Sequence, residues 1–265
     1  MKKSKHRRWP VALLGGLVSV SLTACGPAVQ PMTTATSGTL GILDPTKTGT
    51  LVSPAGWLTL AAGAEAGAQV QDYKEQLSAS IIIGSLHSTF AVYGSLNPAA
   101  QKASLALQEG NTSTDYYQQG QVAYYYDNGH WSRSTPISNL NVYPSYEKLI
   151  SKASAANVPL YQQKRVYVFD EYCNVYTSVL PVSMLSALPD FSTTAKGQSG
   201  QVAVTWYLGQ TDHILRKVDI KSVGGVPDIG SMQVDTSTLI FSINSPLAKV
   251  SIPPDLIKQL ENGAG

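Results

Sequence analysis

The sequence predicts an α+β fold in which one long, curved antiparallel sheet (a half β-barrel) wraps around a few helices. Two observations lead to this prediction. About ten short segments rich in β-branched and aromatic residues follow one another with turns between them. Several of these segments also alternate between apolar and polar side chains, as at Val202, Val204, Trp206 and Leu208. A sheet with one apolar face must be covered, and only a few segments have the periodicity of covering helices.

The first 24 residues are typical of a bacterial lipoprotein signal peptide. Five Lys and Arg residues lie within the first eight positions, and an uncharged, mostly apolar segment of 14 residues (11–24) follows, too short to span a bilayer. It ends in Leu22-Thr23-Ala24-Cys25, which resembles the lipobox whose cysteine is acylated. We expect lipidated Cys25 to anchor the protein on the extracytoplasmic face of a bacterial membrane. The alternatives are a plain secretory signal with an incidental cysteine, or a short uncleaved anchor.

The charge of the chain changes if this signal is removed. The full sequence has 19 basic and 17 acidic residues, a net charge of +2, which excludes a generic basic nucleic-acid binder. Cleavage before Cys25 removes five basic residues and leaves 14 against 17 acidic ones, a net charge of −3. Charged residues make up only 14% of the chain, against about 25% in average domains.

Residues 25–53 are expected to form a flexible tether. The segment is rich in Thr, Pro and Gly, and Asp44 and Lys47 are its only charged residues. Such a composition cannot bury enough apolar area to fold by itself. Residues 54–265 are then expected to form a single folded domain.

The secondary structure of this domain can be predicted in chain order. A helix is expected at 54–71, although Gly63 and Gly67 weaken it. Further helices are expected at 143–157, after Pro144, and at 182–188, with one or two helical turns at 255–261. Strands are expected at 76–83, 86–93, 102–108, 113–118, 121–126, 130–133, 165–169, 173–180, 202–208, 214–223, 238–243 and 250–252. Asn128-Gly129 predicts a tight hairpin turn.

The order of these features resembles the LolA/LolB and LppX/LprG superfamily of half-barrel lipoproteins. A lipobox, a tether and a helix precede the long meander, which includes the segment 122–131. The second half has a strand with Trp206, a polar turn at 209–212, a basic strand at 214–220, a strand with Phe241 and an Ile252-Pro253-Pro254 ending. The resemblance covers roughly residues 54–257. It implies an apolar cavity for acyl chains between the sheet and the helices.

From this resemblance we expect a membrane-anchored lipoprotein that binds or carries a lipid or an acylated molecule, and not an enzyme. The candidate cavity residues are large apolar side chains of the predicted strands. They are Ile81, Ile83, Phe90, Val92, Val204, Trp206, Val218, Ile220 and Phe241. The alternative is a structural or interaction lipoprotein without a cavity, which would use a Tyr-rich surface to contact an envelope protein or polymer.

The sequence offers little for catalysis or metal binding. His87, His130 and His213 are isolated from one another, whereas zinc and iron sites need three or four clustered ligands. There is no Gly-x-Ser-x-Gly motif. Ser145 and Lys148 have the Ser-x-x-Lys spacing, but the Lys47-Thr48-Gly49 triplet precedes them instead of following. We therefore expect no catalytic residue, no metal ligand and no cofactor.

Two further features concern Cys173 and the tyrosines. Cys173 is the only cysteine besides Cys25, and it is expected to be a small buried thiol. Fourteen tyrosines stand against four phenylalanines. Five of them crowd two neighbouring strands, where they predict either cross-strand packing or an amphipathic surface for a ligand or partner. These are Tyr116, Tyr117, Tyr124, Tyr125 and Tyr126.

Overall fold

The computed structural model describes residues 48–83, 86–110, 112–191, 195, 200–223 and 232–262. The expected signal peptide, Cys25 and most of the expected tether lie outside the described residues. None of the described helices is long and apolar enough to cross a membrane.

Within these residues, twelve strands form one antiparallel sheet, as the sequence predicts. The strand order is β1-β8-β9-β10-β11-β12-β2-β3-β4-β5-β6-β7. The strands are β1 (Thr50–Leu51), β2 (Tyr73–Ile83), β3 (Leu86–Asn97), β4 (Lys102–Glu109), β5 (Thr112–Gln119), β6 (Val122–Asp127), β7 (His130–Ser134), β8 (Tyr161–Val168), β9 (Glu171–Pro181), β10 (Gln201–Gly209), β11 (Leu215–Val223) and β12 (Met232–Phe241). The helices are α2 (Ala55–Ala68), α3 (Tyr143–Ala155) and α4 (Pro254–Asn262), and the 3-10 segments are η1 (Val182–Ala187), η2 (Pro189–Phe191) and η3 (Pro246–Ala248).

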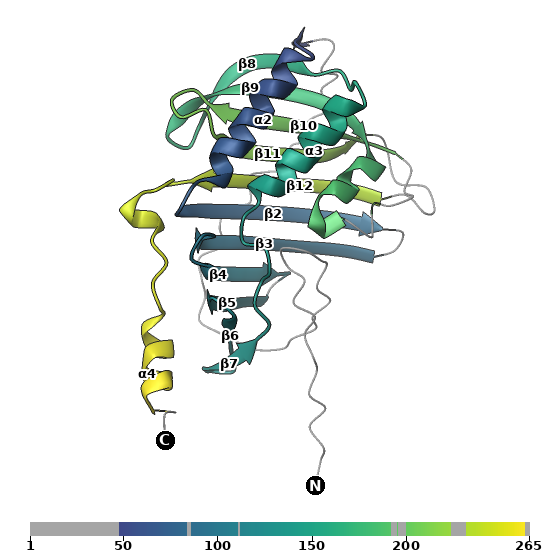
Figure 1. Ribbon diagram of the computed structural model, residues 1–265. Coiled ribbons are helices and arrows are strands. Elements are labelled where there is room, and N and C mark those ends of the chain that lie inside the picture. The colour runs from purple at the N-terminus through teal and green to yellow at the C-terminus, as the bar shows by residue number, and fades with distance from the viewer. Residues whose placement is uncertain are drawn as a thin grey trace.

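The face of the sheet covered by α2 and α3 is called the inner face (Figure 1). The alternation in β10 sets this face: Val202, Val204, Trp206 and Leu208 are all buried, while the residues between them point to the other side. Neighbouring strands continue the pattern through Val218 and Ile220 in β11 and through Leu77 and Ile81 in β2. The main core therefore lies between the inner face and the two helices.

The glycines that weaken the prediction of α2 are explained by close packing. A Cβ at Gly67 would collide with the ring of Tyr143 in α3, and one at Gly63 would collide with Leu208 in β10. The Tyr143 ring is fully buried, and its hydroxyl donates a hydrogen bond to the Leu215 carbonyl at 3.1 Å. The glycines therefore let α2 approach α3 and the sheet closely, and this packing outweighs their low helix propensity.

The C-terminal helix α4 packs near the β7 end of the sheet (Figure 1). Its Leu256 is fully buried in a small cluster with Tyr117 and Trp131, and Tyr124 and Tyr126 pack against this cluster. The Trp131 indole N–H donates to Asp255 at 2.9 Å, and Gln259 bonds both backbone groups of Trp131. Much of the tyrosine cluster is therefore packed between strands and α4, which favours the cross-strand packing interpretation.

Besides strands that begin earlier than predicted, such as β8 and β12, three local predictions differ from the structure. Residues 250–252 form no strand, because Pro253 and Pro254 follow and the chain leaves the sheet toward α4. The short helix expected at 182–188 is the 3-10 segment η1. The last residues of the expected tether join the fold, since Thr50 and Leu51 pair with Gln162 and Tyr161 of β8.

Candidate functional site

A cavity lies between the inner face of the sheet and α3, η2 and the segments that precede these two elements. Its volume is about 70 Å³, and it is partly open to solvent. Its apolar wall includes Leu77, Ala79 and Ile81 of β2, Phe90 of β3 and Ile220 of β11. Leu188 and Phe191, at the 3-10 segments, close it from the opposite side. This arrangement can hold an apolar group by shape and by exclusion of water.

Polar groups also line the cavity. Glu75 of β2 lines it and is only 1% exposed. The lining also includes two amides and three aliphatic hydroxyl groups, from Asn139, Asn141, Ser145, Thr236 and Thr238. The cavity is therefore amphipathic: an apolar wall at Leu77, Ala79 and Ile81 continues along the same strand into a carboxylate.

The charge of Glu75 acts on the buried tyrosines beside it. Burial is the main cause that raises the pKa of Tyr73 and of Tyr143, and repulsion from Glu75 raises both further. The two rings meet edge to face, with their centroids 6.1 Å apart. The Tyr73 hydroxyl donates to the Leu140 carbonyl at 2.9 Å. Both phenols therefore stay protonated and act as hydrogen-bond donors.

Of the nine residues that the sequence singled out for the cavity, seven lie on the inner face and three of these line the cavity. Ile81, Phe90 and Ile220 line it. Four others belong to the buried core of the inner face without touching the cavity, namely Val92, Val204, Trp206 and Val218. Trp206 supports the wall from behind, since its ring meets that of the lining residue Tyr146 edge-on at 6.2 Å. The side chain of Ile83 lies outside the described part of the chain.

Phe241 is placed differently from the expectation. In β12 the inner face carries Val234, Thr236, Thr238 and Ile240, so Phe241 points to the outer face. There its ring lies 4.5 Å from that of Phe169 and 6.2 Å from that of Tyr93. Phe241 is therefore not part of the cavity wall. Leu239 and Phe241 look in the sequence like the buried face of a strand. In β12, however, the inner face carries two threonines instead.

Sequence reasoning missed Glu75 and the other polar residues of the cavity. The segment Tyr73-Lys74-Glu75-Gln76 looks like the solvated start of a strand. The signal that could have found Glu75 is its spacing, because it lies two residues before Leu77 and shares a face with Ala79 and Ile81. The contribution of Asn139 and Asn141 could not be predicted, since they lie in a connection between β7 and α3.

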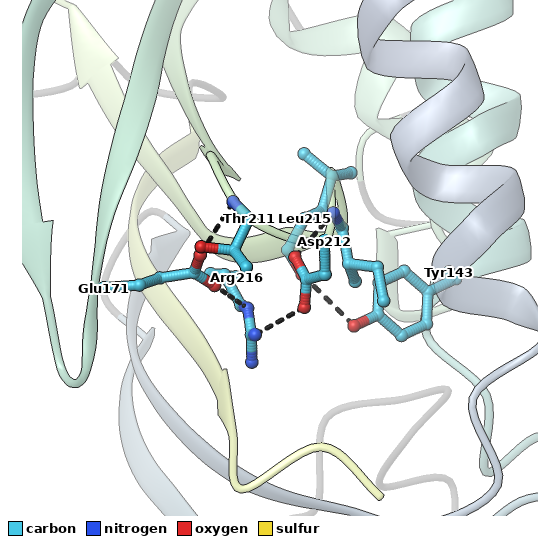
Figure 2. Close-up of polar contacts among 7 residues, drawn as sticks. Tyr143, Glu171, Thr211, Asp212, Leu215 and Arg216 are labelled. Atoms are coloured by element: carbon cyan, nitrogen blue, oxygen red, sulfur yellow. Dashed lines mark hydrogen bonds and ion pairs between the residues drawn. The ribbon is translucent and has the colours of Figure 1, made fainter.

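A second polar cluster, outside the cavity lining, ties β9 to the β10–β11 hairpin. Figure 2 shows Arg216 between two carboxylates. Its Nε lies 2.5 Å from Glu171 Oε1, and its Nη2 lies 2.5 Å from Asp212 Oδ2. The backbone N–H of Thr211 donates to Glu171, and that of Ile214 donates to Asp212. The arginine and Glu171 side chains are each 11% exposed, so this cluster is a structural clamp and not a surface ion pair.

Cys173 lies close to this clamp and is fully buried, as the sequence predicts. Burial raises the pKa of its thiol to about 12, and the nearby carboxylate of Glu171 adds to the shift. Since the thiolate is the reactive form, this cysteine is protected from reaction in the native protein.

We expect the protein to lose stability as the pH rises above about 9. In the unfolded chain, thiols and phenols lose their protons near pH 8.5 and 10. In the native state, burial raises the pKa of Cys173 and of Tyr116 to about 12, and raises those of Tyr73 and Tyr207 as well. The native state therefore keeps protons that the unfolded state loses, and each such proton lowers the free energy of unfolding by about 1.4 kcal/mol per pH unit.

Urea denaturation at pH 8 and pH 10.5 measures this effect, and a Cys173→Ala variant serves as the control that removes the thiol contribution. Equal unfolding free energies at the two pH values would contradict the expected trend. So would a native protein whose Cys173 reacts with a thiol reagent as fast as a small-molecule thiol does.

The described residues contain no cluster of three or more His, Cys, Asp or Glu side chains placed to hold a metal ion. His87 lies on β3, His130 on β7 and His213 in the connection between β10 and β11, and all three are exposed. His87 Nε2 lies 3.2 Å from the Ser80 hydroxyl on the neighbouring strand.

Comparison with solved structures places this fold. The crystal structure of lipoprotein LppX from Mycobacterium tuberculosis matches with a TM-score of 0.50 and 17% identity, over 76% of this chain and 100% of the LppX chain. LprF from Mycobacterium bovis matches with a TM-score of 0.47 and 13% identity, over 78% of this chain and 99% of LprF. A LolA superfamily protein from Nitrosomonas europaea gives a TM-score of 0.25 and 9% identity, over 76% of this chain and 95% of that protein.

No protein-family model matches the sequence, and no curated protein matches it. Of the three structures above, LppX alone reaches a TM-score of 0.5, so it carries the comparison. The chain has the fold of the lipoprotein LppX, and this confirms the half-barrel fold that the resemblance implied.

Proposed function

We propose that the protein is a membrane-anchored lipoprotein of the bacterial cell envelope that binds the apolar part of a lipid or acylated molecule in the cavity of the inner face. The observation that carries the proposal is the apolar wall of Leu77, Ala79, Ile81, Phe90 and Ile220, which stays open between sheet and helices in a fold shared with a lipoprotein. The lipobox at Cys25 supports the anchor.

Binding would work by sequestration. Each Å² of apolar surface that leaves water contributes about 25 cal/mol, whatever the details of the chain that is buried. Glu75 and the surrounding amides and hydroxyls would face the polar part of the same molecule. Release of the ligand then needs a membrane or a partner, such as another protein of the envelope.

The size of the cavity favours a second candidate. An engineered cavity of about 150 Å³ binds benzene, whereas this cavity measures about 70 Å³. As it stands it admits the end of one chain, and a longer ligand requires α3 and the 3-10 segments to move away from the sheet. A lipoprotein with a filled core, which acts through its surface, would instead keep this interior closed.

We expect Ala79→Phe to weaken ligand binding at least tenfold. Ala79 is buried at the centre of the apolar wall, so a phenyl ring there would occupy the space that a ligand needs. The matched control is Ser78→Phe, one residue away on the opposite, exposed face of the same strand. The measurement is the Kd of a fluorescent fatty-acid probe for residues 26–265 and the two variants.

Both variants must first give the near-ultraviolet circular dichroism of the parent protein. Under the proposal, Ser78→Phe binds the probe as the parent does and Ala79→Phe does not. If the two variants bind equally, the ligand does not occupy this cavity. If the parent binds no probe at all, the filled-core alternative is supported.

A further inference from the structure

The hairpin of β8 and β9 carries a cluster of exposed apolar side chains at its tip. Val166, Tyr167, Phe169 and Tyr172 are 40%, 61%, 57% and 58% exposed. They are four of the eleven large apolar side chains that are exposed in the described part of the chain. Tyr167 and Tyr172 face one another across the hairpin, with their ring centroids 5.2 Å apart. This concentration on one hairpin differs from the single exposed apolar residues that any surface carries.

The turn at this tip has an unusual residue. Phe169 and Asp170 connect the two strands, and Phe169 has a φ of 57°. Hairpin turns favour Asn and Gly at such positions, and the β6–β7 turn of this chain uses Asn128 and Gly129. The six other described non-glycine residues with positive φ are Asn, Gln, Ser or His. An aromatic ring in this conformation costs free energy that the turn itself does not require, which points to a role for the ring.

Packing within the domain accounts for part of this role only. The Phe169 ring lies 4.5 Å from Phe241 on the outer face of the sheet. More than half of the Phe169 side chain is nevertheless exposed, and the exposed Tyr167–Tyr172 pair lies on the face of the hairpin opposite to that of Val166. The tip of the hairpin therefore exposes apolar side chains that packing within the domain does not explain.

The N-terminal segment of the chain joins the domain beside this hairpin. The Thr48 hydroxyl donates to Gln163 of β8 at 2.9 Å, and Thr50 and Leu51 pair with the same strand. From Gln163 to Phe169 is six residues, about 20 Å along a strand. Between Cys25 and Thr48 lie 23 peptide steps, a length of chain that can span at most about 80 Å. The tip of the hairpin is therefore within reach of any bilayer that holds a lipid on Cys25.

We propose that Val166, Tyr167, Phe169 and Tyr172 dock into the interfacial layer of the same bilayer to which Cys25 anchors the protein. This proposal rests on the lipid anchor of the proposed function, and it adds a second contact that fixes how the domain faces the membrane. Aromatic side chains favour the water–lipid interface, where their apolar body is buried and their polar tip stays hydrated. Lys164 and Arg165, both exposed on β8, are placed to meet anionic head groups.

A tryptophan reporter tests the docking. Trp57, Trp131 and Trp206 are all buried, and Trp9 leaves with the signal peptide. Phe169→Trp therefore adds an exposed indole at the tip. The lipidated full-length protein is reconstituted into vesicles of phosphatidylcholine and phosphatidylglycerol, with or without bromine on the acyl chains. We expect the added emission to fall at least twofold in the brominated vesicles.

The control reporter is Val122→Trp, at a 42% exposed position of β6 near the far end of the sheet, and its emission should not change. Adding Tyr167→Ser and Tyr172→Ser to the Phe169→Trp protein should restore the lost emission, since the aromatic contact is then reduced. Equal quenching at positions 169 and 122, or no quenching at 169, overturns the docking.

Flotation of the same samples keeps the anchor and the docking apart. If the protein floats with the vesicles but the indole at position 169 is not quenched, the anchor stands and the docking is wrong. If the protein does not float, the anchor of the proposed function fails, and the docking that rests on it fails too. If the indole at 169 changes its emission without vesicles, in proportion to protein concentration, the hairpin binds a second copy of the chain, and the docking is again overturned.

Discussion

Replacing Arg216 with alanine is expected to lower the free energy of unfolding by about 3–5 kcal/mol. The substitution removes the cationic partner that Glu171 and Asp212 share and leaves their carboxylates in a site where the side chains are 11% and 28% exposed. Breaking a buried ion pair from one side costs this much, because the remaining charge stays desolvated without its partner. The clamp also holds the β10–β11 turn through the backbone of Thr211 and Ile214, so its loss frees both strand ends.

Urea denaturation of Arg216→Ala measures the effect. The matched control is Lys221→Ala on the same strand, because the Lys221–Asp235 pair is 4.0 Å apart and about half exposed. That variant should change stability by less than about 1 kcal/mol. Arg216→Lys should recover little, since an ammonium group cannot bond two carboxylates from the fork of a guanidinium. Equal stability of Arg216→Ala and Lys221→Ala would show that the clamp does not support the fold.

Trp206→Ala is expected to cost about 3–5 kcal/mol for a different reason. Trp206 is fully buried in β10, behind Tyr146 of the cavity wall, and truncation leaves a large void in the core. Its indole N–H has no hydrogen-bond acceptor among the described residues. Trp206→Phe therefore keeps most of the packing and removes a buried donor, and it should cost only about 1–2 kcal/mol.

Urea denaturation compares these two Trp206 variants with Val122→Ala, a truncation at an exposed position. A surface truncation should stay within about 0.5 kcal/mol of the parent. If Trp206→Ala and Trp206→Phe cost the same, the size of the void left in the core does not set the loss, and the packing explanation is wrong. Because Trp206 supports the wall without lining the cavity, its variants report on stability, whereas Ala79→Phe reports on binding.

Much of this fold could be predicted because its signals are local. The alternation of Val202, Val204, Trp206 and Leu208 fixed the inner face of β10, and Asn128-Gly129 fixed a hairpin turn. The glycines of α2 weakened the prediction of this helix but did not prevent it. The packing that explains Gly67 could not be predicted, because the ring of Tyr143 lies 76 residues away in the chain.

The cavity could be predicted in part. Ile81, Phe90 and Ile220 were found because apolar residues on an alternating strand share a face. Phe241 was assigned to the wrong face of β12. Threonines occupy part of the inner face, so the sequence does not show which side of this strand is buried. Glu75 was missed because a single carboxylate near a strand end looks solvated until the opposite layer is known. Sequence reasoning therefore misses residues whose burial depends on an element that lies far away along the chain.

The central claim is that the cavity of the inner face holds the apolar part of a lipid or an acylated molecule. Its most direct test is native mass spectrometry of residues 26–265, which lack the lipid-attachment cysteine, made in lipid-containing cells and purified without detergent. The claim predicts a bound mass that organic extraction identifies as a lipid or acylated molecule and that Ala79→Phe, but not Ser78→Phe, abolishes. A protein that carries no bound mass and takes up no fluorescent fatty acid would contradict it.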